Sequence, residues 1–392
     1  MKINGCAIIF SLLLASLVQA NEAVITTSQL KVDTEQHKES SVKLSPSVTV
    51  GVGSTSNATL LNNPTPGAYT KIGPSLLVDY SPREDLLVTG SLEGALKYFP
   101  DSQVSQLANE QSVDAKTDVA WFINENWEAG SNVSFLFLEN HIPTVGADSV
   151  SAQLQKYYQP ELRLYGALNG DRWSTEVGVG ASPRRYLTTT TDIQGNIFKN
   201  SYDASKLDGR IGYRFSQDTR LGFKFSVEQK KYLERMAEFT DGLPVTPGSA
   251  NPNLATLAQD NELQLKTKAY TTNFNSTLGI RFEKDQIFGA RDSVRYRFKQ
   301  KAIVPLSNRL SLEPEVAISR QNYSNFRSDP INDPKNSPLR TDWDTQLGSS
   351  LKWAVLQNMT LSMQYAYNRK STNYELENYT EHVIETGMGM QF

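Results

Sequence analysis

Apolar and polar residues alternate with a period of two along most of the chain from Ser45 onward. Such alternation is typical of β-strands with one apolar face, because successive side chains of a strand point to opposite sides. The alternating segments are separated by interruptions, and short interruptions alternate with long ones along the chain. The short interruptions are rich in the Asn, Asp, Ser and Pro residues that favour tight turns. They lie at residues 81–85, 124–126, 169–171, 216–218, 305–308 and 356–358. The pattern predicts a meander of antiparallel hairpins.

The alternation changes phase between residues 262 and 283. Leu263 holds one parity in this stretch, whereas Leu278 holds the other. A change of parity requires either a β-bulge or a turn. We place a turn near residues 271–275, which divides the stretch into two strands and brings the count to about sixteen. A count of fourteen stays open if one weak hairpin lies outside the wall.

The last eight residues carry a second pattern, in which a polar residue, a glycine, an apolar residue and a terminal aromatic residue follow at fixed spacing. Glu385, Gly387, Met390 and Phe392 fill these positions. This ending resembles the C-terminal strand signal of Gram-negative bacterial outer-membrane β-barrel proteins, and the layout of strands and turns is porin-like without indicating a subfamily. The resemblance implies an all-β fold, a transmembrane antiparallel up-and-down β-barrel with an even number of strands, short periplasmic turns and long outer loops. It also implies that the last strand contacts the barrel assembly machinery and that the wall contacts outer-membrane lipid and lipopolysaccharide.

The first 20 residues have the features of an export signal. Lys2 precedes an apolar run over residues 7–14, and Ala20 offers a small residue at the expected cleavage site. We therefore expect a signal peptide at 1–20, removed after Ala20, a short periplasmic lead-in at 21–44 and a transmembrane barrel at 45–392. The expected location is the bacterial cell outer membrane.

Composition agrees with a barrel that has a polar lumen. Hydrophobic residues make up 39% of the chain and the mean hydropathy is -0.44, which excludes a protein made of membrane-spanning helices. Without Lys2 the 39 Lys and Arg become 38 against 42 Asp and Glu, a net charge of about -4, so nothing favours nucleic acid as a partner. Cys6 is the only cysteine and lies in the signal segment, so the exported chain has no disulfide and no cysteine-based metal site.

The five tryptophans share one parity on the expected strands. Trp121, Trp127, Trp173 and Trp353 lie near short turns, and Trp343 lies near the opposite rim. An aromatic belt at the membrane interfaces has this distribution on the outer face of a barrel. A soluble β-sandwich is the alternative, but its tryptophans would point into the core.

The opposite parity gives a charged lumen with two different walls. The expected basic wall consists of Lys206, Arg210, Arg214, Arg220, Lys224, Lys266, Lys268, Arg281, Arg295, Arg297, Lys299 and Lys301. The expected acidic wall includes Asp114, Asp118, Glu161, Glu313, Glu315, Asp342 and Asp344. Walls of opposite charge would place a transverse field across a wet lumen.

These features favour a porin-like channel for passive diffusion of small polar or charged solutes. A sixteen-stranded barrel is wide enough for an aqueous channel, whereas eight strands would be filled by side chains. Two alternatives stay open. The basic wall also suits an export conduit for an acidic polysaccharide, although no repeat domain precedes the barrel, and charges that pair across a filled lumen would give a plugged structural barrel. The proline-rich stretch 234–259 is a candidate for a loop that folds into the lumen or stays on the surface.

An outer-membrane hydrolase is the least favoured function. Its only support is His141, which lies beside Glu139 and near Asp148, while His382 shares the outward parity of Phe392. No Gly-x-Ser-x-Gly, phosphate loop or zinc-ligand spacing occurs. We therefore expect no enzymatic activity, no cofactor and no metal.

Overall fold

The computed structural model describes residues 41–60, 64–101, 104, 108–145, 150–191, 197–237, 252–328, 336–373 and 377–392. The expected signal peptide and most of the expected lead-in lie outside the described residues and stay predictions. Within the described part of the chain, no helix is long and apolar enough to cross a membrane.

Sixteen long strands form the wall of the molecule. The first seven are β1 (Ser41–Thr55), β2 (Gly67–Arg83), β3 (Leu86–Tyr98), β4 (Glu110–Phe122), β5 (Trp127–Val145), β6 (Val150–Asn169) and β7 (Trp173–Ala181). The other nine are β11 (Tyr202–Arg214), β12 (Thr219–Met236), β13 (Asn253–Ala269), β14 (Thr272–Asp285), β15 (Ser293–Pro305), β16 (Leu310–Arg327), β17 (Leu339–Leu356), β18 (Met359–Thr372) and β19 (Tyr379–Gln391).

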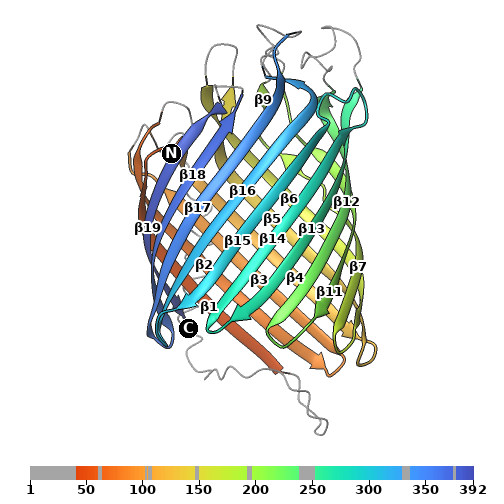
Figure 1. The fold of residues 1–392 in the computed structure, drawn as a ribbon, viewed down its shortest axis with the longest axis vertical. Helices are drawn as coiled ribbons and strands as arrows, with labels where there is room; N and C mark the ends of the chain where they lie inside the picture. The colour runs from red at the N-terminus through yellow and green to blue at the C-terminus, as the bar shows by residue number, and fades with distance from the viewer. Residues whose placement is uncertain are drawn as a thin grey trace.

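Each long strand pairs antiparallel with the next, and β19 pairs with β1 to close the barrel (Figure 1). The closing seam runs from the pair Ser47 and Gln391 to the pair Thr55 and Val383. The Phe392 N–H donates a hydrogen bond to the Pro46 carbonyl at 2.9 Å, so the seam is paired to the last residue. We call the end with the short turns, where the C-terminus also lies, the turn end and the opposite end the loop end.

One position in the wall is shared by two segments. The strand β7 stops at Ala181, and the chain then forms β8 (Arg185–Tyr186), which pairs with β6. A bridge between Arg184 and Tyr202 joins the same segment to β11. The wall between β6 and β11 therefore continues toward the loop end. The strands β9 (Thr190–Thr191) and β10 (Ile197–Phe198) form a separate small hairpin beyond it.

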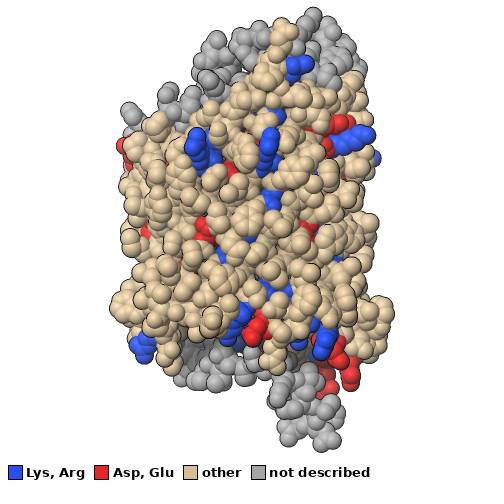
Figure 2. Space-filling view, in the orientation of Figure 1, with Lys and Arg blue, Asp and Glu red and all other residues tan. Residues whose placement is uncertain are grey.

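The register divides the wall residues into an outer and a luminal set, because paired residues point to the same side. All five tryptophans fall in the outer set and are between 43% and 59% exposed. Figure 2 shows an outer face on which charged side chains are sparse over the middle and more frequent toward both ends. This distribution suits a wall that faces hydrocarbon between two polar interfaces.

The predicted fold class is confirmed: the protein is a closed, antiparallel, all-β barrel of 16 strands. The turn expected at 271–275 lies slightly earlier, at Tyr270 and Thr271, between β13 and β14. Tyr270 adopts the left-handed conformation, with φ 54°, which a two-residue hairpin connection favours. The other short turns lie at or beside their predicted positions.

Two predicted boundaries differ from the structure. The strand β1 begins at Ser41, four residues before the expected start of the barrel, because β1 keeps pairing with β2 as far as Ser41 and Ser81. The stretch 234–259 is not all loop, since Asn253–Gln259 pair within β13. Residues 238–251, on which the proposal of a luminal loop rested, lie outside the described residues.

The seam at the C-terminus yields a first prediction about assembly. Replacing Phe392 with Ser should lower the yield of folded barrel several-fold without affecting export, because the last residue both completes the seam and carries the terminal aromatic of the assembly signal. Heat-modifiable gel mobility of membrane fractions measures the folded yield. Tyr270→Ser, an equal loss of an aromatic at a fully exposed turn, is the matched control and should fold normally. Equal yields of the two variants would contradict this role of Phe392.

The two ends of the barrel yield a second prediction about orientation. Ile197→Cys lies at the loop end, where the native side chain is 70% exposed, and Asn126→Cys lies in an exposed turn at the other end. On intact cells a membrane-impermeant thiol reagent should label the first variant and not the second. The chain after residue 20 has no native cysteine to confuse the result. The opposite labelling would invert the expected orientation.

Candidate functional site

The register gives luminal parity to every residue of the expected basic and acidic walls. For example, Arg210 on β11 lies opposite Lys224 on β12, and Lys301 on β15 lies opposite Glu315 on β16. The structure therefore brings the predicted residues to one surface, the inside of the barrel. That their side chains line an open path for ions stays a prediction.

Where the basic and acidic walls meet, between β15 and β16, their charges neutralise one another. Lys299 Nζ lies 2.8 Å from Glu315 Oε1, and Lys301 Nζ lies 2.9 Å from Glu313 Oε2. Lys352 Nζ on β17 reaches the other oxygen of Glu313 at 3.0 Å. These cations are therefore held against carboxylates of neighbouring strands instead of facing an acidic wall across the lumen.

A second group of ion pairs bridges β12 to β15. Arg281 on β14 lies 3.7 Å from Asp260 on β13 and 4.0 Å from Glu228 on β12. Arg297 on β15 forms an ion pair with the same Asp260, across the intervening β14. Contacts between strands that are not neighbours are possible only on the concave, luminal side of the wall. They support the assignment of this face as the inside.

Arg163 on β6 is the centre of a third group, on the far side of the basic wall. Its guanidinium lies 2.7 Å from Glu176 and 2.6 Å from Asp208, and Glu176 also accepts from Arg210 at 2.5 Å. A Cβ at position 178 would lie 2.6 Å from the guanidinium, so Gly178 gives Arg163 the room to cross β7. The charges were visible in the sequence, but their pairing depends on the register of three strands.

The basic residues at the turn end differ from these pairs. Arg214, Arg220, Lys266 and Lys268 are exposed. Within the described part of the chain, none of them has a carboxylate within ion-pair distance. On the expected acidic wall, Asp118 and Glu128 accept hydrogen bonds from Tyr165 at 3.2 and 2.9 Å and have no cation partner there.

An apolar cluster that the sequence analysis missed covers part of the luminal face at the loop end. Phe99 and Val104, in the connection after β3, pack against Tyr69 of β2 and are almost fully buried. The Tyr69 hydroxyl donates to Glu385 at 3.0 Å, which places this cluster inside the barrel. The apolar residues Val104 and Ala108, four apart in the connection, were the available signal.

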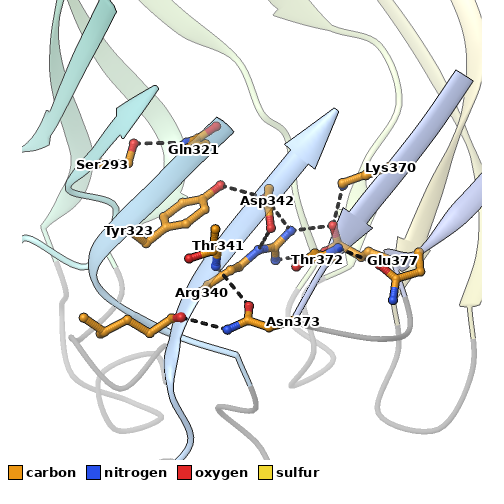
Figure 3. A network of polar contacts seen from close by, with 12 residues as sticks. Ser293, Gln321, Tyr323, Arg340, Thr341, Asp342, Lys370, Thr372, Asn373 and Glu377 are labelled. Atoms are coloured by element: carbon orange, nitrogen blue, oxygen red, sulfur yellow. Dashed lines mark hydrogen bonds and ion pairs between the residues drawn. The ribbon is translucent and has the colours of Figure 1, made fainter. Parts of the chain in front are cut away.

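A polar network at the loop end ties β17 to the connection between β18 and β19 (Figure 3). Arg340 donates to Asp342 at 2.8 and 3.0 Å and to Glu377 at 3.0 Å, and Lys370 donates to Glu377 at 2.6 Å. Burial would raise the pKa of the Glu377 carboxyl, but the hydrogen bonds and charges of Arg340 and Lys370 outweigh it, so this pKa is lowered. Asp342, placed on the acidic wall by the sequence, belongs to this buried network.

The residues considered for hydrolysis do not form a catalytic group in the described residues. His141 Nδ1 contacts the Asn109 carbonyl at 3.3 Å, and Glu139 is paired with Lys156 at 2.8 Å. His382 contacts the Tyr365 hydroxyl at 3.0 Å on the outer face. Asp148 and His37 lie outside the described residues. Among the residues described, no group of three or more His, Cys, Asp or Glu side chains could hold a metal ion.

No protein-family model and no curated protein matches the chain. Solved structures do match its fold. The outer membrane channel DcaP of Acinetobacter baumannii is 11% identical with a TM-score of 0.51, and 91% of this chain and 99% of that chain are covered. OprB of Pseudomonas putida is 9% identical with a TM-score of 0.51 and coverage of 90% and 94%. OccAB3 of Acinetobacter baumannii is 7% identical with a TM-score of 0.50 and coverage of 90% and 99%.

At these identities the likeness shows the fold alone. The chain has the fold of bacterial outer-membrane β-barrel proteins, as its C-terminal pattern predicted.

The loop-end network yields a third prediction. Because the folded-state pKa of Glu377 is lowered, the network's stabilisation is present above the ordinary carboxyl pKa and is lost as pH falls through the folded-state pKa. Glu377→Gln should lower the free energy of unfolding at neutral pH by about 1.5–3 kcal/mol, the usual contribution of hydrogen bonds to charged groups. Urea titrations at a series of pH values should show the difference from the wild type shrinking as the solution is acidified. A difference independent of pH would exclude the carboxylate as its source.

Proposed function

We propose that this protein is a porin-like channel of the outer membrane through which small polar or charged solutes diffuse passively. The carrying observation is the exposure of charged side chains inside a closed barrel. The side chains of Arg210, Lys116 and Lys299 are 60%, 58% and 53% exposed although they have luminal parity. A lumen filled by packed side chains would bury them.

In the outer membrane the proposed partners are the surrounding lipids and the machinery that assembles barrels. The outer tryptophans and the sparsely charged wall suit contact with membrane lipid and lipopolysaccharide, and the seam of β19 with β1 suits delivery by the barrel assembly machinery. The fold of OprB, OccAB3 and the channel DcaP supports this setting without identifying a solute.

An export conduit for an acidic polysaccharide is the second candidate, favoured by the exposed cations at the turn end. A plugged barrel would follow if the apolar cluster of Phe99 and Val104 closed the lumen. Recordings of single channels in planar bilayers separate these possibilities from a diffusion channel. For the wild type we expect stepwise increments of current that are proportional to voltage, whereas a barrel that inserts without conducting would refute the proposal.

The boundary between the two walls yields a fourth prediction, on selectivity. In the variant K299Q/K301Q, Glu315 loses its cation and Glu313 keeps only Lys352. The reversal potential in a salt gradient should therefore shift toward cation preference. The shift should shrink in 1 M salt, because the Debye length falls from about 10 Å at 0.1 M to about 3 Å.

The matched control is the fourfold variant K299Q/K301Q/E313Q/E315Q, which removes both members of each pair and leaves the net charge unchanged. Its reversal potential should return toward that of the wild type. A conducting channel whose selectivity is the same in all three proteins would show that these side chains lie away from the ion path.

A further inference from the structure

Three cations lie side by side on the luminal face at the turn end of the wall. Arg214 on β11 is opposite Arg220 on β12, and Arg220 is opposite Lys266 on β13. Lys268 follows two residues along β13, with the same parity. We call Arg214, Arg220, Lys266 and Lys268 the turn-end cation cluster. Like charges directly opposite one another in a sheet destabilise it, so this arrangement needs a physical explanation.

These strands have room for carboxylates beside their cations, because ion pairs form on them closer to the loop end. The unpaired cations at the turn end therefore need another explanation. Glu176 forms ion pairs with Arg163 and Arg210, and the Glu262 carboxylate lies 3.8 Å from Lys224 Nζ. Both carboxylates are therefore engaged elsewhere. The only side-chain hydrogen bond recorded for the cluster in the described residues runs from Arg220 to the Ser174 hydroxyl at 2.8 Å. Most of the cluster's donors are left to the lumen.

The residues next to the cluster mostly contribute further hydrogen-bond donors. Asn275 lies opposite Lys266 and Asn273 opposite Lys268 on β14, and both asparagines are exposed. The carbonyl of Arg172 accepts from the Arg214 N–H at 2.8 Å, which brings another basic residue next to the cluster. Asp171 and Asp218 lie in the adjacent turns, and neither forms an ion pair with the cluster in the described residues.

We propose that the turn-end cation cluster is a binding subsite for small anions that carry phosphate or carboxylate groups, at the turn-end mouth of the lumen. The inference deepens the proposed channel function, since it names the class of solute that the lumen selects. Guanidinium groups bind such oxygens through two parallel hydrogen bonds, and the asparagine amides can donate to the remaining oxygens. Bound anion offsets the repulsion among the cations.

The wall about a quarter of the way round the barrel favours the same placement. Asp118 on β4 and Glu128 on β5 also lie toward the turn end, and their described partner is the Tyr165 hydroxyl and not a cation. An anion in this part of the lumen is therefore repelled from β4 and β5 and attracted to β11, β12 and β13. The subsite is one-sided, so a dipolar solute would enter it with its anionic group toward Arg214 and Arg220.

Equilibrium binding of inorganic pyrophosphate to the folded, detergent-solubilised protein at low salt tests the subsite by isothermal titration calorimetry. We expect the variant R214Q/R220Q/K266Q to bind at least about tenfold more weakly, as loss of several charge-assisted contacts implies. The matched control K116Q/K299Q/K352Q removes three cations of luminal parity that are paired with Asp114, Glu315 and Glu313. It should bind pyrophosphate within about twofold of the wild type, because it leaves the direct contacts intact.

Equal pyrophosphate affinity of the wild type and the turn-end variant would overturn the proposal. An equal loss of affinity in both triple variants would also overturn it, because it would indicate attraction by the overall positive potential of the lumen and not by a local subsite. Heat-modifiable mobility shows that each variant is folded. The binding measurement is independent of conduction. Binding without conductance would refute the channel and keep the subsite, whereas conductance without binding would do the reverse.

A second ligand separates small anions from a polymer. An acidic hexasaccharide of uronic acids should bind the wild type no more tightly than pyrophosphate if the subsite takes single anionic groups. If the hexasaccharide binds at least about tenfold more tightly, a gain typical of linked contacts, and the turn-end variant abolishes this gain, the cluster serves a polymer and the small-anion proposal fails.

Discussion

Every other feature of this structure depends on the need to pair the backbone polar groups of the wall strands. In a bilayer no water is available to the N–H and C=O groups of an exposed sheet edge, so a sheet that crosses the membrane must close on itself. The pairing of β1 with β19 achieves this, down to the hydrogen bond from Phe392 to Pro46. Closure also separates two environments completely. Residues of one parity form the outer face, where charged side chains are sparse over the middle. Residues of the other parity can be charged at little cost because they face an aqueous or ion-paired interior.

The distribution of charge inside the barrel follows from this separation. Along β14 to β17 most luminal cations lie against carboxylates of nearby strands, as in the pairs Lys299 with Glu315 and Lys301 with Glu313. Such partly exposed pairs add little stability each, but they remove the repulsion that unmatched charges on adjacent strands would cause. Arg214, Arg220 and Lys266 lack this neutralisation. The wall thus combines a neutralised sector with a sector that keeps its positive potential at one mouth.

Much of this architecture could be predicted from the sequence because a β-barrel wall has a strict period of two. The outward position of Trp343 and the luminal parity of Lys301 follow from counting residues, and the change of phase after Leu265 revealed the turn at Tyr270. The terminal pattern added what periodicity could not, namely that the strands close into a membrane barrel. The shift of the turn to 270–271 shows the limit, since neither Tyr nor Thr is a typical turn residue.

The contacts between side chains could not be predicted, because they depend on the stagger of neighbouring strands and on space that no periodicity encodes. Arg163 on β6 reaches Asp208 on β11 across β7 for two reasons. Position 178 of β7 is glycine, and the registers of β6 and β11 with β7 bring the two side chains to the same height. Val104 likewise packs inward against Tyr69 and Phe99, which come from other segments of the chain, with Val383 of β19 beside them. Parity therefore determines which side chains enter the lumen, whereas register determines which of them are neutralised. The electrostatic character of the lumen is therefore set by register.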